Sequence, residues 1–351
     1  MLLYRLACVA LVLLLSCQRP SGAGFEVLDE INGSDGKDEM VAVIDKTVHY
    51  NNLPSASGLE MLGDHFYVIG DDSPYLYRLD RNYNIVSQVA IFDTAGFGNG
   101  RIAKAEKPDL EGMALLQYQG KPYLFMLGSG SAPARRRGFL YNICGDSICA
   151  EWAEQEGARA VNLDELYRQL EKPEIIGEGL LNIEGVAAGH GKLYLLQRAI
   201  GKGQHVLISY KLSEFIPYLL SDAGAPLPKP SFSFFSLPEL NYLQAGFSGA
   251  FVFDDKLFFT ASLEDTRDAI NDGAVLGSYI GFIPFTFTKK PGTLPVNATL
   301  IMQPDGKPYT GKAESLVVKQ RLGKGKYSFV VVSDDDQGGS ELLELTLTIG
   351  K

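Results

Sequence analysis

The sequence predicts an all-β protein built as a propeller, because one short signature recurs five times and the same order of strands follows it each time. The signature is an apolar residue, then Ser or Glu, then a tiny residue, then an apolar strand start. Its Ser or Glu occurs at five positions: Ser57, Glu111, Glu184, Ser248 and Glu314. Four short strands per repeat, separated by turns, are the pattern of a propeller blade.

Each signature is followed by a turn, an aromatic-rich second strand such as FYVIG or YLFMLG, a polar loop and a third strand. The candidate fourth strands are IVSQVAIF, ARAVNL, SFSFFSL and NATLIMQ. The fifth repeat has three strands, and residues 40–50, MVAVIDKTVHY, supply the missing one. An N-terminal strand that completes the last blade closes the ring and removes exposed sheet edges. We therefore predict five four-stranded blades, and six remain possible if one blade lacks the signature.

Helix is expected only in short stretches on connecting loops, over residues 162–172 and 211–220.

The N-terminal residues are typical of a cleaved targeting segment. Arg5 precedes an apolar run over residues 6–15, and this run is too short to span a membrane. Residues 14–17, Leu-Leu-Ser-Cys, resemble the bacterial lipobox, so we predict a signal peptide over 1–16, lipidation of Cys17, a tether over 17–39 and the propeller over 40–351. The alternative is an ordinary secretory signal that contains Cys17. A lipid on Cys17 would attach the protein to the bacterial cell envelope, and we expect it at the outer membrane, facing either the periplasm or the cell surface.

Charge and cysteine use narrow the possible partners. The formal net charge of −10 disfavours a nucleic-acid partner and favours cations. Cys144 and Cys149 flank a four-residue turn that contains Gly and Asp, so we predict a disulfide between them in an oxidising compartment. Two free thiols or half of a metal site are the alternatives, but no second cysteine pair or nearby histidine completes a zinc site.

The polar residues of the repeats are predicted to meet at one rim. In antiparallel neighbours, the start of the first strand and the end of the second lie at the same edge. The signature positions therefore line the channel, and the loops after the second strands lie above it. Those loops carry Asp71, Asp72, Ser129, Arg198, Ser262, Glu264, Asp334, Asp335 and Asp336 and, further along, Arg135, Arg136, Arg137, Lys202 and His205.

This rim predicts a cation site. Three glutamates round a narrow channel repel one another, so they gain from a cation, and a rim of oxygen ligands without soft ones suits calcium. We predict Glu111, Glu184 and Glu314 as the metal ligands. An anionic small ligand is predicted at Arg198, Asp71, Asp72, Asp334 and Asp335. A structural role is the alternative: the inner strand needs a residue that tolerates water and a glycine that permits close approach.

At these residues the chain resembles the phytase-like, or esterase-like, β-propeller superfamily, whose blades open with an Asp-x-Glu-Gly-Ile-Ala signature. Residues 109–114, DLEGMA, and 182–187, NIEGVA, match it, and residues 313–316, AESL, match it in part. The resemblance extends through the repeats over roughly residues 40–350. It implies acidic central positions and, in some relatives, a metal-dependent phosphoesterase or esterase activity. Ser57 and Ser248 depart from the pattern because they replace Glu.

Two functions follow from these observations. The first is a ligand-binding protein or a hydrolase whose site is the acidic rim, with the cation activating water if the protein is an enzyme. The second is a non-catalytic scaffold that binds another envelope protein through the long insertions at 150–182 and 213–245.

Overall fold

The computed structural model describes residues 39–350, apart from 92, 94–96, 98–99, 144–157, 221–224, 241, 266–273, 287–291 and 335–337. These residues belong to one compact unit that spans Lys37–Lys351. The predicted signal peptide, Cys17, Cys144, Cys149, Asp335 and Asp336 lie outside the described residues, so the predictions for them stay predictions. None of the described helices is long and apolar enough to cross a membrane.

Most of the described strands form five four-stranded antiparallel units, four of which take their strands in chain order. The first is β2 (Ala56–Leu62), β3 (His65–Gly70), β4 (Tyr75–Leu79) and β5 (Ile85–Ala90). The second is β6 (Leu110–Tyr118), β7 (Lys121–Gly128), β8 (Gly138–Asn142) and β9 (Arg159–Val161). The third is β10 (Ile183–Gly189), β11 (Lys192–Gln197), β12 (His205–Lys211) and β13 (Ser231–Ser236). The fourth is β16 (Gly246–Phe253), β17 (Lys256–Glu264), β18 (Val275–Pro284) and β20 (Asn297–Met302), and the fifth is β21 (Lys312–Gly323), β22 (Lys326–Asp334), β23 (Ser340–Ile349) and β1 (Met40–Tyr50).

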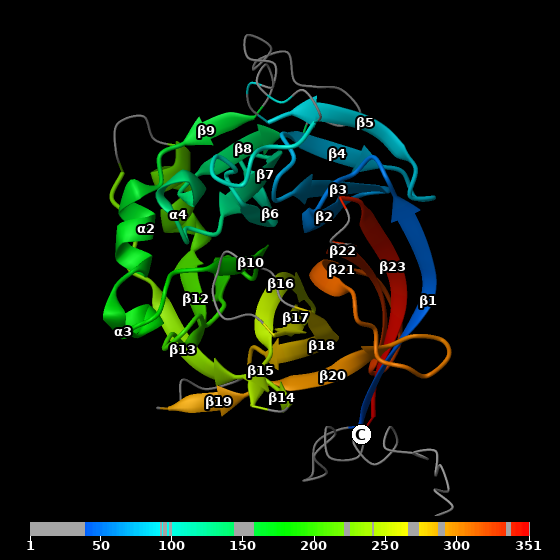
Figure 1. Cartoon of the computed structure of the whole chain (residues 1–351). Helices are drawn as coiled ribbons and strands as arrows, with labels where there is room; N and C mark the ends of the chain where they lie inside the picture. The colour runs from blue at the N-terminus through cyan, green and yellow to red at the C-terminus, as the bar shows by residue number, and fades with distance from the viewer. Residues whose placement is uncertain are drawn as a thin grey trace, which may run out of the picture. The chain divides into compact units, whose positions relative to one another are not determined.

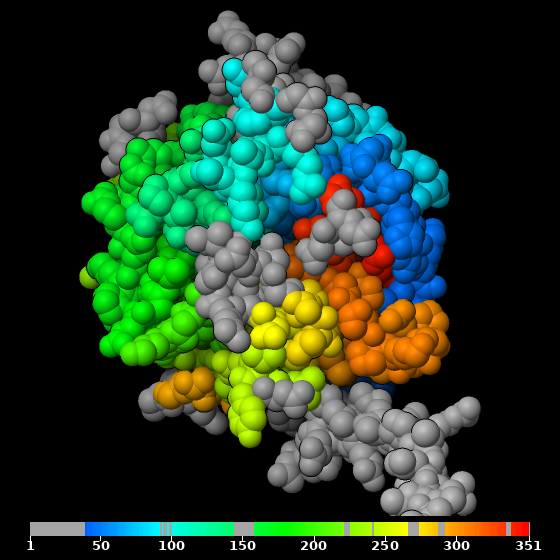
Figure 2. Space-filling model, in the orientation of Figure 1, coloured from blue at the N-terminus to red at the C-terminus, as the bar shows by residue number. Residues whose placement is uncertain are grey.

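The first strands of the five units form a closed ring. β2 contacts β6, β6 contacts β10, β10 contacts β16, β16 contacts β21, and β21 returns to contact β2. Figure 1 shows the units following one another round this centre, and Figure 2 shows their colours running round the same face in chain order. The chain is therefore a β-propeller, as its repeats predict.

The N-terminal strand β1 joins the two ends of the ring. It pairs antiparallel with β23 from Met40 opposite Ile349 to Tyr50 opposite Ser340. On its other side, Ala42 and Val43 pair in parallel with β20 of the fourth unit. β1 completes the last blade as predicted, and it also joins that blade to the fourth in one eight-stranded sheet.

Each signature contains a β-bulge. The pairing between the first and second strands shifts by one residue at Ser57, Glu111, Glu184, Ser248 and Glu314. A bulge leaves one residue outside the ladder and re-aims its side chain. The recurrence of Ser or Glu therefore marks the unpaired position of the inner strand in all five units.

The glycine after the bulge lies where two blades meet. A Cβ on Gly112 would be 2.5 Å from Val186 Cγ2, and one on Gly249 would be 2.5 Å from the Glu314 carbonyl oxygen. In the fifth unit Ser315 takes this place, and its Oγ accepts a hydrogen bond from the Leu59 N–H at 3.2 Å. The prediction that this glycine permits close approach is confirmed.

The hydrophobic core fills the spaces between neighbouring blades, and short helices extend it. Helices α2 (Asp164–Leu170), α3 (Pro173–Ile176) and α4 (Leu212–Leu220) lie within the insertions that the sequence places on connecting loops. Tyr167 and Phe215 are fully buried against the second and third blades. The Tyr167 hydroxyl donates to the Gly128 carbonyl at 2.9 Å and to the Arg137 carbonyl at 3.0 Å. The described parts of these insertions are therefore partly core.

Three short strands have no counterpart in the repeat. β14 (Glu239–Leu240) and β15 (Leu243–Gln244) form a hairpin before the fourth blade. β19 (Thr293–Pro295) pairs in parallel with β13 and adds a fifth strand to the third blade. Because three residues carry little periodicity, the sequence pattern does not reveal this strand.

Candidate functional site

Three glutamates from three blades meet at the centre of the ring. Glu111 lies at the start of β6, Glu184 at the start of β10 and Glu314 at the start of β21. One carboxylate oxygen from each lies within 4.8 Å of the others. The structure thus brings together the three residues that the sequence predicts as metal ligands, because their equivalent places in the repeat put all three at the same end of the channel.

The three carboxyl groups are poorly compensated. Glu184 and Glu314 are 6% and 4% exposed, and the Oε2 atom of each is buried without a hydrogen-bond partner among the described residues. Burial, followed by neighbouring acidic groups, raises the pKa of Glu111 well above its usual range. Burial also raises the pKa of Glu184, and it raises that of Glu314 to about 8 against partial compensation by Lys312. Unpaired buried carboxylate oxygens are costly, so the trio gains from a proton or a cation.

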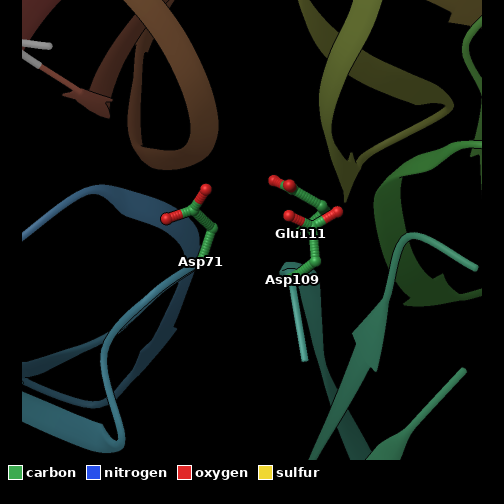
Figure 3. A group of neighbouring side chains, drawn as sticks. All are labelled: Asp71, Asp109 and Glu111. Atoms are coloured by element: carbon green, nitrogen blue, oxygen red, sulfur yellow. The ribbon is translucent and has the colours of Figure 1, made fainter. Parts of the chain in front are cut away.

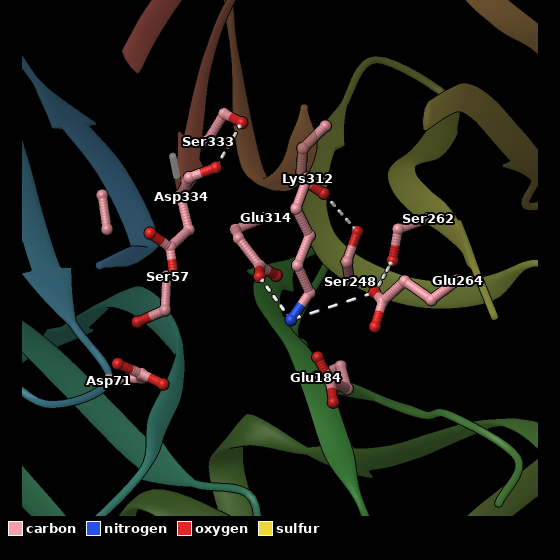
Figure 4. A network of polar contacts seen from close by, with 12 residues as sticks. Ser57, Asp71, Glu184, Ser248, Ser262, Glu264, Lys312, Glu314, Ser333 and Asp334 are labelled. Atoms are coloured by element: carbon pink, nitrogen blue, oxygen red, sulfur yellow. Dashed lines mark hydrogen bonds and ion pairs between the residues drawn. The ribbon is translucent and has the colours of Figure 1, made fainter. Parts of the chain in front are cut away.

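Two basic side chains and a fourth glutamate complete what we call the central cluster: Glu111, Glu184, Glu314, Glu264, Lys312 and Arg198. Lys312 Nζ lies 2.9 Å from Glu314 Oε1 and 3.9 Å from Glu264 Oε1 (Figure 4). Arg198 Nη2 lies 2.9 Å from Glu264 Oε1. Arg198 and Lys312 outweigh burial and lower the pKa of Glu264 to about 2. Four carboxyl groups face two cations, which leaves a formal excess of two negative charges when all are ionised.

A second acidic group shares Glu111. Oxygens of Asp71, Asp109 and Glu111 lie within 4.8 Å of one another (Figure 3). Lys107 already forms an ion pair with Asp71 and lies 2.9 Å from Asp109 Oδ1. Arg135 Nη1 lies 2.8 Å from Asp109 Oδ2. The two aspartates therefore have two cationic partners, whereas the Glu111, Glu184 and Glu314 trio carries the uncompensated charge.

The other residues that the sequence places on the rim differ in their surroundings. Asp72 Oδ2 accepts a hydrogen bond from Arg101 Nε at 2.7 Å, whereas its Oδ1 is buried without a hydrogen-bond partner among the described residues. Asp334 pairs in register with Lys312 and is drawn near Glu314 in Figure 4. His205 is buried, its Nδ1 accepts a hydrogen bond from Ala199 N–H at 3.1 Å, and burial lowers its pKa to about 4. Lys202, in contrast, is exposed and lies 3.7 Å from Glu178.

The two signature serines make bonds between blades. Ser57 Oγ donates to the Leu110 carbonyl of the second blade. Ser248 Oγ donates to the Ala313 carbonyl of the fifth blade at 2.5 Å. A serine at the bulge thus fastens its blade to the next signature, while a glutamate there contributes charge to the channel. In these two blades the signature residue therefore has a structural role, which is the alternative that the sequence left open.

Sequence reasoning missed Lys312, and it treated Glu264 as a peripheral loop residue. Glu264 is in fact the last residue of β17 and is 8% exposed, because Arg198 and Ser262 hold it inside the cluster. Lys312 stands two residues before Glu314, and its Nζ lies 2.9 Å from Glu314 Oε1. The same offset places Asn182 where its side chain donates to Glu184 Oε1. Extending each signature by two residues toward the N-terminus would have identified Lys312 and Asn182 as residues of the site.

Gly246 makes room for Arg198. A Cβ at Gly246 would lie 2.4 Å from Arg198 Nε and 2.7 Å from its Cγ. We predict that Gly246→Ala moves the guanidinium off Glu264 and destabilises the protein by about 1–3 kcal/mol, because a buried carboxylate loses a partner. Urea unfolding measures this change. Gly323→Ala is the control, since its Cβ would meet nothing within 4 Å, and equal midpoints for the two variants would contradict the prediction.

Comparisons with solved structures find enzymes and semaphorins among the similar chains. The chain is 14% identical to the glutaminyl cyclase of Myxococcus xanthus, with a TM-score of 0.45, over 90% of this chain and 100% of that one. It is 11% identical to the arabinanase Arb43A of Bacillus subtilis, with a TM-score of 0.40, over 86% of this chain and 96% of that one. The aldose sugar dehydrogenase of Streptomyces coelicolor, in its PQQ-bound form, has a TM-score of 0.37 at 13% identity, over 88% and 99% of the two chains. These likenesses concern the fold, and the resemblance to the phytase-like superfamily stays a prediction.

A search of curated proteins finds no match to this sequence. The model of a family of unknown function, DUF6929, matches residues 52–347. This range runs from just before the first signature almost to the end of β23, so it includes all five signatures and every residue of the central cluster. The chain belongs to the family of unknown function DUF6929.

Proposed function

We propose that the propeller binds a divalent cation through Glu111, Glu184 and Glu314 and holds an anionic small ligand beside it. The observation that supports this most strongly is the meeting of three glutamates from three blades within 4.8 Å, two of which carry a buried oxygen without a partner among the described residues. A cation would satisfy these oxygens and offset the repulsion between the carboxylates.

The donor set suits a hard cation. The three candidate ligands are carboxylates, which calcium and magnesium prefer over softer ligands. The formal charge of the central cluster, an excess of two negative charges, equals the charge of one divalent ion. The Asp71 and Asp109 pair is a weaker candidate because Lys107 and Arg135 already neutralise it. We therefore place the proposed cation on the Glu111, Glu184 and Glu314 side, with calcium as the first ion to test.

Basic groups next to the trio support an anionic ligand. Arg198 follows β11 of the third blade and Lys312 begins β21 of the fifth, and each is mostly buried and paired with a glutamate. Buried guanidinium and ammonium groups bind phosphate and carboxylate oxygens strongly. These two side chains would orient the anion while the glutamates hold the cation.

Hydrolysis of a phosphate or carboxylate ester is the activity that such a site would serve, and the phytase-like resemblance points to the same class. A bound cation would supply Lewis-acid polarisation of the ester and an acidified water. We include in the proposal the envelope location and the lipid on Cys17, for which the lipobox is the support.

The experiment is a cation titration of the chelator-treated protein followed by thermal melting. Calcium is expected to raise the melting temperature, since a ligand that binds only the folded state adds about 2.7 kcal/mol at one hundred times its dissociation constant. Glu111→Gln, Glu184→Gln and Glu314→Gln should each weaken this stabilisation, because Gln keeps the size of the side chain and removes its charge.

Glu60→Gln is the matched control. Glu60 is a buried glutamate of β2 outside the cluster, and its Oε2 accepts a hydrogen bond from the Leu115 N–H at 2.9 Å. This variant should respond to calcium as the native protein does. The proposal fails if calcium, magnesium, manganese and zinc at millimolar concentration all leave the melting temperature unchanged.

A further inference from the structure

The ammonium of Lys312 lies between two glutamates, of which only one belongs to the carboxylate trio. Its Nζ is 2.9 Å from Glu314 Oε1, in the carboxylate trio, and 3.9 Å from Glu264 Oε1, outside the trio. Glu264 is held independently, because Oε1 accepts a hydrogen bond from Ser262 Oγ at 2.6 Å and pairs with Arg198 Nη2 at 2.9 Å. The Lys312 side chain is 17% exposed, so its ammonium is a built part of the cluster rather than a solvated surface charge.

We propose that Lys312 determines the cation selectivity of the site: its ammonium is the resident counter-ion of Glu314, and a divalent cation binds by displacing that ammonium onto Glu264. This inference rests on the proposed function, because it requires a cation to bind the trio. It assigns Lys312 a role as a positioning and selectivity residue that contacts a metal ligand rather than the metal.

The position of Glu264 makes the displacement feasible. An ammonium that left Glu314 for an apolar environment would be buried and unpaired, which is strongly unfavourable. Glu264 is within reach of the same ammonium and is already fixed in place by Arg198 and Ser262. Figure 4 shows the ammonium group of Lys312 between Glu314 and Glu264, with Glu184 drawn below it. A short swing of the lysine would therefore exchange one carboxylate partner for another.

Competition of this kind favours divalent over monovalent ions. A monovalent ion would replace one positive charge by another on Glu314, so it gains little attraction while it forces the lysine to move. A divalent ion brings one additional charge to three converging carboxylates and gains correspondingly more. The site would then select divalent over monovalent ions through the competing Lys312 ammonium as well as through its carboxylate ligands. Selectivity against an unwanted partner is commonly obtained by such an unfavourable element.

The test is calorimetric titration of the full-length, chelator-treated protein with calcium chloride, with and without sodium chloride as competitor. Lys312→Met is expected to tighten calcium binding at least tenfold and to let sodium compete, because the resident charge is gone. Lys312→Arg keeps the charge, but its planar fork can hold Glu314 and Glu264 together. We expect it to weaken calcium binding at least threefold, whereas a lysine that acts only through its overall charge predicts no change.

Lys319→Met is the matched control. Lys319 lies on the same strand, β21, and its Nζ is 3.3 Å from Glu344 outside the central cluster. Its loss removes the same charge, and calcium affinity should stay within twofold of the native value. Should Lys312→Met fail to fold, Glu264→Gln tests the same step, because the displaced ammonium then lacks its second partner and calcium binding should weaken.

The outcomes separate the two proposals. If the native protein binds calcium but Lys312→Met binds it no more tightly, or Lys312→Arg behaves like the native protein, Lys312 is not the competitor and the inference is overturned while the cation site stands. If neither the native protein nor any variant binds a cation, the proposed function fails and this inference fails with it.

Discussion

Ile44→Asp is expected to destabilise the propeller by about 4 kcal/mol or more. Ile44 is 4% exposed, pairs with Leu345 of β23 and packs in the core between the fourth and fifth blades. The change removes a buried aliphatic side chain and places a carboxylate in an apolar space. It also disturbs the strand that joins the two ends of the ring. Urea unfolding followed by circular dichroism measures the loss.

Val41→Asp on the same strand is the matched control. Val41 is 46% exposed, so its replacement buries no charge, and we expect a loss below about 1 kcal/mol. A similar unfolding midpoint for the two variants would mean that β1 does not hold the ring closed. A large loss for Ile44→Asp alone would show that closure depends on the buried face of β1.

The stability of the chelator-treated protein is expected to fall between pH 6.5 and 8. The pKa of Glu314 is about 8 in the folded protein against an ordinary value of 4.5, chiefly because of burial. A carboxyl group with a raised folded-state pKa binds its proton more tightly when folded. Its contribution to stability is therefore complete below pH 4.5 and is lost as the pH rises through 8. The loss is on the order of a few kcal/mol.

The titration of other buried groups determines the pH range in which the carboxyl groups alone change the stability. The pKa values of Glu111, Glu184 and Asp71 are also raised, and that of Glu60 is raised to about 7, so all act in the same direction. His205 acts oppositely below pH 6.5, because burial lowers its pKa to about 4 and its neutral form is favoured by folding as the pH rises from 4 to 6.5. Above pH 6.5 the carboxyl groups alone determine the expected slope among these residues.

Glu314→Gln should flatten this slope, since an amide does not titrate. Glu174→Gln on the exposed side of α3 should leave it unchanged. The measurement is the urea midpoint at intervals from pH 6 to 9, in the presence of a chelator. A native midpoint that rises over this range would contradict the raised pKa of the carboxylate trio.

The repeat made most of the fold predictable. The five signatures, the order of strands and the role of residues 40–50 could be read from the sequence, because a blade imposes period-two patterning and turns at regular places. The helices at 164–170 and 212–220 were also found, but their burial was not, since a helix on a connecting segment has no partner until the blades are assembled. The strand β19 was not predicted, because three residues are too few to show a periodic pattern.

The site was predictable only in part, and the reason is electrostatic. Equivalent places in the repeat predicted that Glu111, Glu184 and Glu314 would converge. Arg198 and Glu264 were also expected at the rim, but the pairing of Lys312 with Glu314 and Glu264 was not, because Glu264 lies 48 residues before Lys312 and in another blade.

The sequence by itself determined the propeller class, the ring-closing strand and the identity of the three central glutamates, since each follows from a periodic pattern along the chain. Only the tertiary structure decided which carboxylates remain uncompensated: Lys107 and Arg135 neutralise Asp71 and Asp109, whereas two buried oxygens of Glu184 and Glu314 find no partner among the described residues. Charge compensation depends on distances of a few ångströms between side chains from different blades, and such distances exist only once the ring has closed.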